Sequence, residues 1–152
     1  MSTRIFVLED HATMRDTLVA FVSALPDTEV CGSAASAEDA LAKLAEARAD
    51  LVLVDITLPG MSGLDFLREA RKRWPRLQYL VLSGRDEAAY LFPALSMGAN
   101  GYLSKGNADR LMEAIDCVLR GERYPPPAGG AKKKDQVGSG SLSSMRVRRR
   151  TR

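Results

Sequence analysis

Five polar side chains stand at or just after the end of short apolar runs in this sequence: Glu9, Asp10, Asp55, Ser83 and Lys105. Three carboxylates that come close together repel one another unless a cation lies among them. Oxygen ligands of this kind suit Mg²⁺, which keeps several of its waters and takes few protein carboxylates. A hydroxyl and an ammonium beside them match the needs of phosphoryl oxygens. The residue types therefore indicate phosphoryl chemistry at a magnesium site, if the fold brings the five together.

The apolar runs before these residues predict the strands of a parallel sheet. Polar alternation is missing from them, as in strands that are covered on both faces. They lie at Ile5–Leu8, Leu51–Val54 and Tyr79–Leu82, with shorter versions around Val30–Cys31 and Tyr102–Leu103.

Stretches in which apolar residues recur at helical spacing separate these runs. They extend over Met14–Leu25, Ala40–Ala45, Leu64–Trp74 and Leu111–Leu119, with a less regular one from roughly Asp86 to Met97. Ser36 and Asn107 are expected to cap two of the helices at their N-termini. Gly98 and Gly121 are expected to follow the C-termini of two others.

Five strand–helix units in residues 1–123 predict an α/β fold, a doubly wound five-stranded parallel sheet with helices on both faces. Right-handed crossovers restrict the topology, and the flavodoxin-like strand order 2-1-3-4-5 is the favoured one for a small domain. Ligands of such sheets bind outside the carboxyl ends of the strands. The five polar side chains are expected to converge at that edge.

The chain of 152 residues has a net charge of +3, which divides into an acidic body and a basic tail. From Pro125 onward eight Lys and Arg residues outnumber a single acid, so residues 1–124 carry −4. The tail is rich in Pro, Gly and Ser and has no helical or strand periodicity, which is typical of a disordered linker. We therefore expect one domain at 1–123 and a basic, linker-like tail at 124–152.

The composition excludes a membrane protein and a disulfide-rich secreted protein. No apolar run approaches the ~18 residues of a membrane span, and the N-terminus lacks the apolar segment of a signal peptide. Two cysteines, Cys31 and Cys117, match no zinc or disulfide framework and suit a reduced cytosol. A cytoplasmic location is expected.

The loop Asp55–Gly63 carries the most specific local pattern of the chain. Together with the acid pair, Ser83 and Lys105 it resembles the receiver domain of bacterial two-component response regulators, over roughly residues 3–123. Tyr102, three residues before the lysine, also fits this family. The segments most similar to its NarL/FixJ (LuxR-type) branch are Glu9-Asp10-His11 and Met97–Lys105.

The resemblance implies how the site would work. Asp55 would accept a phosphoryl group from a histidine kinase or a phosphotransfer protein, as a carboxylate nucleophile. Asp10, Asp55 and the backbone carbonyl of Thr57 would hold Mg²⁺ (or Mn²⁺), with Glu9 acting through water. The protein would catalyse only its own phosphorylation and dephosphorylation, so it would not be an enzyme that turns over other substrates.

A conformational switch is implied as well. Lys105 and Ser83 would contact phosphoryl oxygens, and Tyr102 would move from an exposed to a buried position. The residues expected to tune the lifetime of the phosphorylated form are Thr57, Gly84 and Arg85.

Three positions depart from the family pattern. Glu9 stands where Asp is more usual, and Gly106 follows Lys105 where proline is usual. Pro93 falls in the predicted fourth helix, where it removes a backbone hydrogen bond and costs about 3 kcal/mol unless the helix kinks. Relatives use this helix for output. Self-association, with a possible homodimer, is expected either through the first and fifth helices or through the fourth-helix face, and Pro93 favours the former.

The sequence fits other phosphoryl- or nucleotide-binding sites less well than it fits a receiver, and other conspicuous residues are expected to have structural roles. A phosphatase of the haloacid dehalogenase type needs a second Asp two residues after the nucleophile, where this chain has Thr57. Neither GxGxxG after the first strand nor GxxxxGK[ST] occurs, so dinucleotide and P-loop sites are excluded. His11 is expected at a solvated helix start, and the basic cluster within Arg68–Arg76 on a solvated face.

Two forms of output remain open. Relatives of this branch usually carry a C-terminal helix-turn-helix domain that binds DNA, and the 28 residues from Pro125 are too few for one. The chain is then the receiver part of a transcriptional regulator whose DNA-binding domain is absent. Alternatively, it is a stand-alone receiver whose basic tail contacts nucleic acid or a protein partner.

Overall fold

The computed structural model describes residues 2–84 and 93–126, apart from the side chains of 106–108. Within these ranges five parallel strands form one sheet in the order β2-β1-β3-β4-β5. The strands are β1 (Thr3–Leu8), β2 (Thr28–Ala34), β3 (Leu51–Asp55), β4 (Gln78–Ser83) and β5 (Gly101–Ser104). The predicted flavodoxin-like fold is confirmed, and each predicted apolar run lies in one of these strands.

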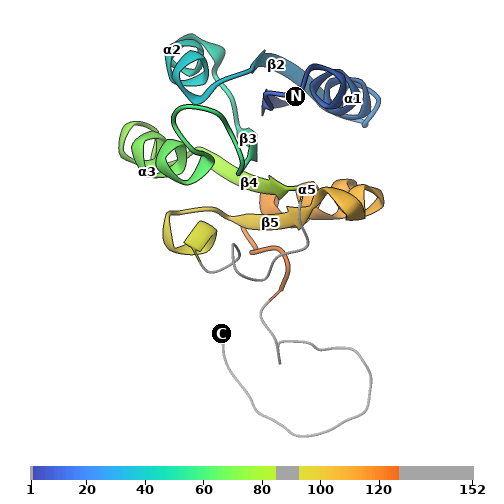
Figure 1. Cartoon of the computed structure of the whole chain (residues 1–152). Helices are drawn as coiled ribbons and strands as arrows, with labels where there is room; N and C mark the ends of the chain where they lie inside the picture. Colours follow the sequence, from blue (N-terminus) through green and yellow to red (C-terminus); the bar gives the residue numbers. More distant parts are fainter. Residues whose placement is uncertain (1, 85–92, 127–152) are drawn as a thin grey trace, which may run out of the picture.

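Helices cover both faces of the sheet. One face carries α1 (Ala12–Ser23) and α5 (Leu111–Leu119), and the other carries α2 (Ala37–Ala47) and α3 (Gly63–Arg73), as Figure 1 shows. A 3₁₀ helix, η1 (Lys105–Arg110), connects β5 to α5.

Each central strand sends alternate side chains to opposite faces, because successive residues of a strand point in opposite directions. Val52 and Val54 of β3 pack with α2 and α3, whereas Leu51 and Leu53 pack with α1 and α5. All four side chains are buried, and full burial of one such side chain is worth about 1.5–3 kcal/mol. This double coverage is the reason for the missing polar alternation in the sequence.

Several helix ends follow the sequence prediction. Ser36 caps α2, its Oγ accepting a hydrogen bond from the Asp39 amide at 3.1 Å. Gly98 and Gly121 have φ angles of 107° and 87°, a conformation that glycine adopts without the steric cost of a Cβ.

Two other helix predictions have a different outcome. Asn107 is not at the N-cap position of the last helix, because it lies within η1 and that position is Arg110, which makes no side-chain cap hydrogen bond. The 3₁₀ turn provides its own i to i+3 hydrogen bonds, which remove the need for a cap at Asn107. The predicted fourth helix lies largely outside the described residues, although 93–96 are helical and Pro93 is the first of them.

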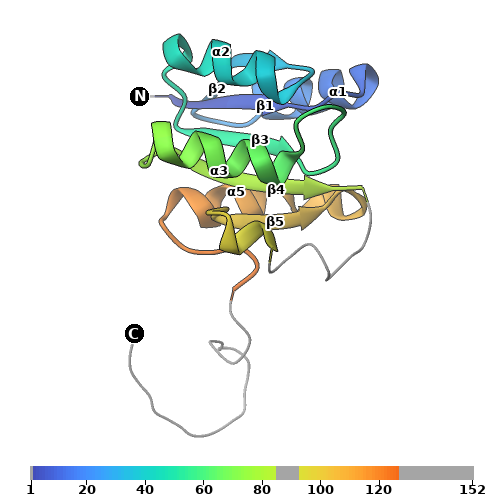
Figure 2. The same ribbon diagram turned by 60° about the vertical axis from the view of Figure 1, so that its left-hand side comes forward.

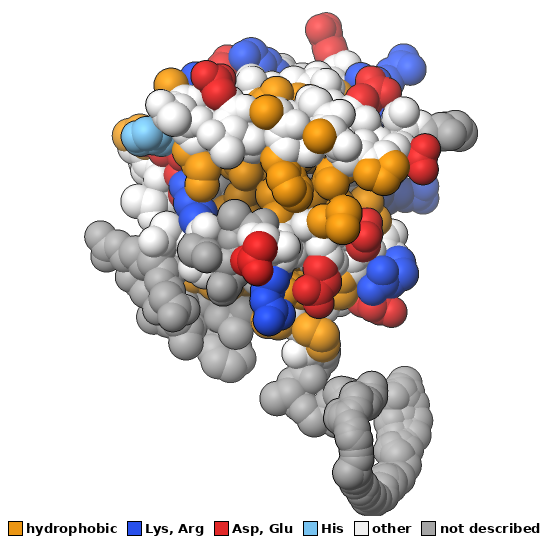
Figure 3. All heavy atoms as spheres, turned by 90° about the vertical axis from the view of Figure 1, so that its right-hand side faces the viewer, with side chains coloured by type: hydrophobic (Ala, Val, Ile, Leu, Met, Phe, Trp, Pro, Cys, Tyr) orange, Lys and Arg blue, Asp and Glu red, His pale blue; other side chains and the backbone are white. Residues whose placement is uncertain are grey.

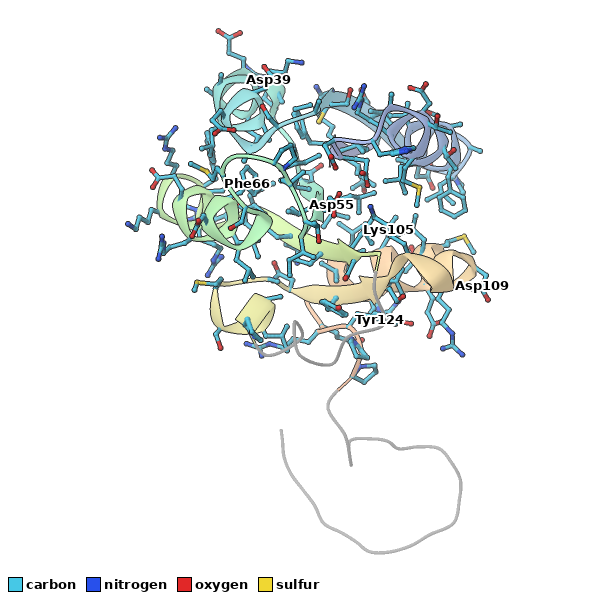
Figure 4. All side chains as sticks on the ribbon, viewed as in Figure 1. Asp39, Asp55, Phe66, Lys105, Asp109 and Tyr124 are labelled. Atoms are coloured by element: carbon cyan, nitrogen blue, oxygen red, sulfur yellow. The ribbon has the colours of Figure 1, made fainter. Side chains whose placement is uncertain are left out.

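The chain after α5 returns to the outer edge of β5. Tyr124 forms a parallel bridge with Gly101, in which the Tyr102 amide donates to the Tyr124 carbonyl at 2.7 Å and the Tyr124 amide donates to the Asn100 carbonyl at 3.2 Å. The Tyr124 side chain, labelled in Figure 4, is only 6% exposed and packs in the core under α1 and α5. The packed body therefore extends at least to Tyr124, past the expected boundary at 123.

The carboxyl ends of the strands meet at one edge of the sheet. Figure 2 shows the strands from the side, with the loop between β3 and α3 at the edge to which the arrows point. Of the helices in the described part of the chain, none is long and apolar enough to span a membrane.

Candidate functional site

The edge formed by the strand ends gathers the residues that the sequence singled out. Glu9 comes directly after β1, Asp55 is the last residue of β3, and Ser83 is the last residue of β4. Lys105 begins η1 directly after β5. Because the strands are parallel, these four positions lie at the same edge, where Figure 4 shows Asp55 and Lys105 close together.

The three carboxylates form a compact cluster at this edge. Glu9, Asp10 and Asp55 each offer an oxygen, and these atoms lie within 4.8 Å of one another. Glu9 and Asp55 are 1% and 4% exposed, while Asp10 is exposed to solvent. A set of carboxylate oxygens with one side open to water fits Mg²⁺, which retains several waters when it binds a protein.

Lys105 inserts its ammonium group between the two buried carboxylates. Its Nζ lies 2.6 Å from Glu9 Oε1 and 3.3 Å from Asp55 Oδ2. Burial by itself lowers the pKa of Lys105, but the two carboxylates outweigh it and raise the pKa above its ordinary value. The lysine therefore carries a full positive charge throughout the physiological pH range.

Asp55 is held in an environment that disfavours its charge. Burial, reinforced by the neighbouring carboxylate of Glu9, raises the pKa of Asp55 from 3.8 to about 7. The Thr57 amide, which donates to Asp55 Oδ1 at 3.0 Å, and the Lys105 ammonium lower the pKa but offset only part of this rise. A further cation at the cluster would favour the ionised form of Asp55.

The loop after Asp55 folds back closely on its own strand. A Cβ at Gly63 would lie 2.5 Å from the Asp55 carbonyl oxygen, so only glycine fits at the start of α3. The Gly63 amide donates to the Ile56 carbonyl at 3.2 Å, and the Ile56 amide donates to the Leu82 carbonyl of β4 at 3.0 Å. These contacts fix the backbone on which the Asp55 carboxylate is carried.

Comparison with known proteins identifies the arrangement. Residues 5–116 match the response regulator receiver domain. The chain belongs to this family. The receiver is 32% identical over 125 residues to the transcriptional regulatory protein DegU of Brevibacillus brevis, covering 82% of this chain and 53% of that protein. It is 33% identical over 123 residues to the oxygen regulatory protein NreC of Staphylococcus epidermidis, covering 80% of this chain and 56% of that one. The chain thus spans about half the length of these relatives.

Solved structures agree with this assignment. A LuxR-family two-component response regulator from Aurantimonas sp. SI85-9A1 superposes with a TM-score of 0.77 at 29% identity, covering 81% of this chain and 89% of that one. The signal receiver domain of NarL from Mycobacterium tuberculosis superposes with a TM-score of 0.69 at 28% identity, covering 78% and 97%. The similarity to the NarL and LuxR-type branch, indicated by the sequence, is confirmed.

Ser83 and Tyr102 of the receiver occupy neighbouring strands. Ser83 is fully buried and Tyr102 is 9% exposed, and in the ladder Ser83 pairs with Ser104, two residues beyond Tyr102. The family resemblance implied that Tyr102 moves from an exposed to a buried position on phosphorylation, and in this structure the side chain is buried. Gly84 lies beside Lys105, since a Cβ there would meet the lysine Cδ at 4.0 Å. Arg85 lies outside the described residues.

His11 lies at an exposed helix start, as expected from the sequence. Its Nδ1 accepts a hydrogen bond from the Met14 amide at 3.4 Å and so caps α1. Its own amide donates to Glu9 Oε2 at 3.1 Å, which helps to hold the first acid of the pair.

Sequence reasoning missed one residue that contacts the site. The Arg15 guanidinium donates through Nη1 to the backbone carbonyl of Glu9 at 2.8 Å. One signal in the sequence could have indicated this contact: a basic residue one turn into the helix that follows an acid pair. Side chains of a helix point back toward its N-terminus, so a long basic side chain at this position lies over the preceding turn.

Proposed function

We propose that Asp55 accepts a phosphoryl group from the phosphohistidine of a histidine kinase or phosphotransfer protein, so that the chain acts as a phosphorylation-activated switch. An Asp55 oxygen forms the new bond to phosphorus while the phosphorus–nitrogen bond of the phosphohistidine breaks, and the imidazole nitrogen keeps the electron pair. The observation that carries the proposal is the buried Asp55 carboxylate at the end of β3, with an ammonium 3.3 Å away and two further acids beside it.

The residues around Asp55 would bind the metal ion, orient the nucleophile and contact the phosphoryl oxygens. Glu9, Asp10, Asp55 and the Thr57 backbone carbonyl would hold Mg²⁺ (or Mn²⁺), which when bound neutralises negative charge on the acids and the phosphoryl oxygens. The Thr57 amide orients the nucleophile. Lys105 provides a positive charge for one phosphoryl oxygen and Ser83 a hydroxyl for another, and each contact favours the phosphorylated arrangement.

The reaction is a single modification of the protein itself. The site would catalyse its own phosphorylation and the later hydrolysis of the aspartyl phosphate, and we assign no turnover of other substrates. Thr57, Gly84 and Arg85, which the family resemblance implies as tuning residues, would set the lifetime of the phosphorylated form. Membership of the receiver family, whose members typically act in the cytoplasm, supports a signalling role there.

The names of the relatives favour control of transcription as the output of this receiver. DegU is by name a transcriptional regulatory protein, and the matched region is about half of that protein, so a DNA-binding part would lie outside the region that the two proteins share. A stand-alone receiver is the second possibility, in which the basic residues after Pro125 contact nucleic acid or a protein partner.

Self-association is the step that would link the receiver to its output. Figure 3 shows a band of hydrophobic side chains across the face formed by α1 and α5, with charged side chains above and below it. Met112 of α5 is 49% exposed, and Met14, Val19 and Leu119 are half-buried on the same two helices. A second copy of the chain could cover this band, since mixed charges at its rim are compatible with a symmetric contact.

Intact-mass measurement tests the phosphoacceptor assignment. With acetyl phosphate and Mg²⁺ the chain should gain one group of about 80 Da, the mass of HPO₃. Asp55→Asn should abolish the gain, and excess chelator should prevent it. Labelling that survives either treatment would remove the proposed function.

A further inference from the structure

Arg15 forms a link between α1 and the acid pair that the proposed function does not use. Its Nη1 donates to the Glu9 carbonyl at 2.8 Å, and its own amide donates to the His11 carbonyl at 2.8 Å. The arginine therefore connects both ends of the turn from Glu9 to His11. Its side chain is half-buried, which limits its freedom to leave this contact.

The other polar groups of Glu9 have partners of their own. Its amide donates to the Ala34 carbonyl of β2 at 3.0 Å, its Oε2 accepts from the His11 amide at 3.1 Å, and its Oε1 forms the ion pair with Lys105 at 2.6 Å. The carbonyl that Arg15 contacts belongs to the peptide between Glu9 and Asp10. The orientation of that peptide decides where the exposed Asp10 carboxylate points relative to Asp55.

We propose that Arg15 is a positioning residue for the cation site, holding the peptide between the two acids so that both carboxylates remain beside Asp55. The inference rests on the proposed function, because it assumes that the acid cluster binds Mg²⁺. Partners that orient metal ligands in this way typically contribute 10- to 100-fold to metal affinity.

The sign of the effect separates positioning from simple charge. Arg15 is a cation close to a site for a cation, so its charge alone opposes Mg²⁺ binding. If only the charge mattered, removing it would make Mg²⁺ bind more tightly. If Arg15 positions the acids, removing it makes Mg²⁺ bind more weakly in spite of the relieved repulsion.

The test compares Arg15→Met and Arg15→Gln with the wild-type chain and with Arg68→Met. Arg68 is a matched control, because it is exposed on α3 and pairs with Asp65 of the same helix at 3.2 Å. The melting temperature is followed as a function of Mg²⁺ concentration, since a ligand of the folded state raises it according to its Kd. We expect the Kd for Mg²⁺ to rise about tenfold in both Arg15 variants and to stay unchanged in Arg68→Met.

Amide hydrogen exchange gives a readout that needs neither the metal nor phosphorylation. Without Mg²⁺, the amides of Asp10 and His11 should exchange faster in Arg15→Gln than in the wild type, with the core strands unchanged. An unchanged or lower Kd for Mg²⁺ in the Arg15 variants would overturn the proposal, whatever the stability of the variants without metal. If wild-type chain binds Mg²⁺ but takes up no phosphoryl group at Asp55, the proposed function fails while the positioning role stands.

Discussion

The Glu9 carboxylate lies 2.6 Å from the Lys105 ammonium, closer than the Asp55 carboxylate that lies 3.3 Å from the same nitrogen. The side chain of Glu9 is one methylene longer than that of an Asp, which lets this buried acid reach across to the lysine. A phosphoryl group on Asp55 would compete with Glu9 for that ammonium. The pair therefore connects the metal side of the site to its phosphate side.

Removal of the lysine tests how much the site depends on this pair. Lys105→Met leaves two buried carboxylates without their shared cation, which should lower the free energy of unfolding at pH 8 by up to about 3 kcal/mol. The loss should shrink at pH 5, because protonation of Asp55 then relieves the repulsion. Urea unfolding in the presence of chelator measures both values. Lys43→Met, which removes an exposed ion pair with Asp39, should change little, and an equal loss at both pH values would contradict the prediction.

The raised pKa of Asp55 predicts how stability depends on pH. Between its ordinary pKa of 3.8 and about 7, the folded chain holds a proton on Asp55 that the unfolded chain has released. The contribution of Asp55 to stability is therefore greatest below pH 4 and is lost as the pH rises to about 7, by about 1.4 kcal/mol for each pKa unit. Asp55→Asn, which cannot ionise, should be more stable than the wild type at pH 8 without metal.

Urea unfolding of both chains from pH 4 to pH 8, with chelator present, checks this prediction. The difference in the free energy of unfolding should grow with pH in favour of Asp55→Asn. Added Mg²⁺ should reduce the difference at pH 8, because it stabilises the ionised carboxylate of the wild type alone. Parallel stability curves for the two chains would show that Asp55 is not held in the protonated form.

The switch residues give a separate prediction. Phosphate must bind the active arrangement more tightly than the resting one, since equal affinity shifts no population. Ser83→Ala should still accept a phosphoryl group on Asp55 but respond weakly to it. Beryllofluoride mimics the phosphoryl group, and the NMR signals of Tyr102 should change on its addition to the wild type much more than in Ser83→Ala. Equal, full responses would show that Ser83 does not couple the site to Tyr102, whatever the role of Asp55.

The position of Tyr124 predicts where the tail can be cut. Truncation after Pro126 should leave the melting temperature and the phosphorylation of Asp55 unchanged. Truncation after Gly121 removes a buried aromatic side chain and the two backbone hydrogen bonds to the edge of β5, which should cost about 2–4 kcal/mol. Because β5 leads directly into Lys105, phosphorylation should also slow. Equal stability of the two truncated chains would show that Tyr124 contributes nothing to the fold.

The sequence predicted the strands, and the placement of polar residues at their carboxyl ends, because both depend on local patterns. An apolar run such as Leu51–Val54 indicates a strand that is covered on both faces. Asp55 comes directly after this run, so it is expected at the carboxyl end of the strand, where ligands bind. The contacts of Arg15 and Tyr124 could not be predicted in this way. The first depends on where a flexible side chain turns, and the second on a strand-edge pairing between positions 101 and 124, which periodicity does not encode.

The hydrophobic band on α1 and α5 leads to the last prediction. Met112→Glu places a charge at the most exposed large apolar residue of the described chain, where a folded monomer tolerates it because the side chain is already half in water. If a second copy covers the band, the charge must be buried without a partner in the dimer, which is costly. Sedimentation velocity with beryllofluoride and Mg²⁺ should then show a dimer for the wild type and a monomer for Met112→Glu. Ala45→Glu introduces the same charge at an exposed position of α2, on the opposite face of the sheet, and should dimerise as the wild type does. A Met112→Glu chain that still dimerises with beryllofluoride, while Ala45→Glu does not, would place the contact on the α2 side.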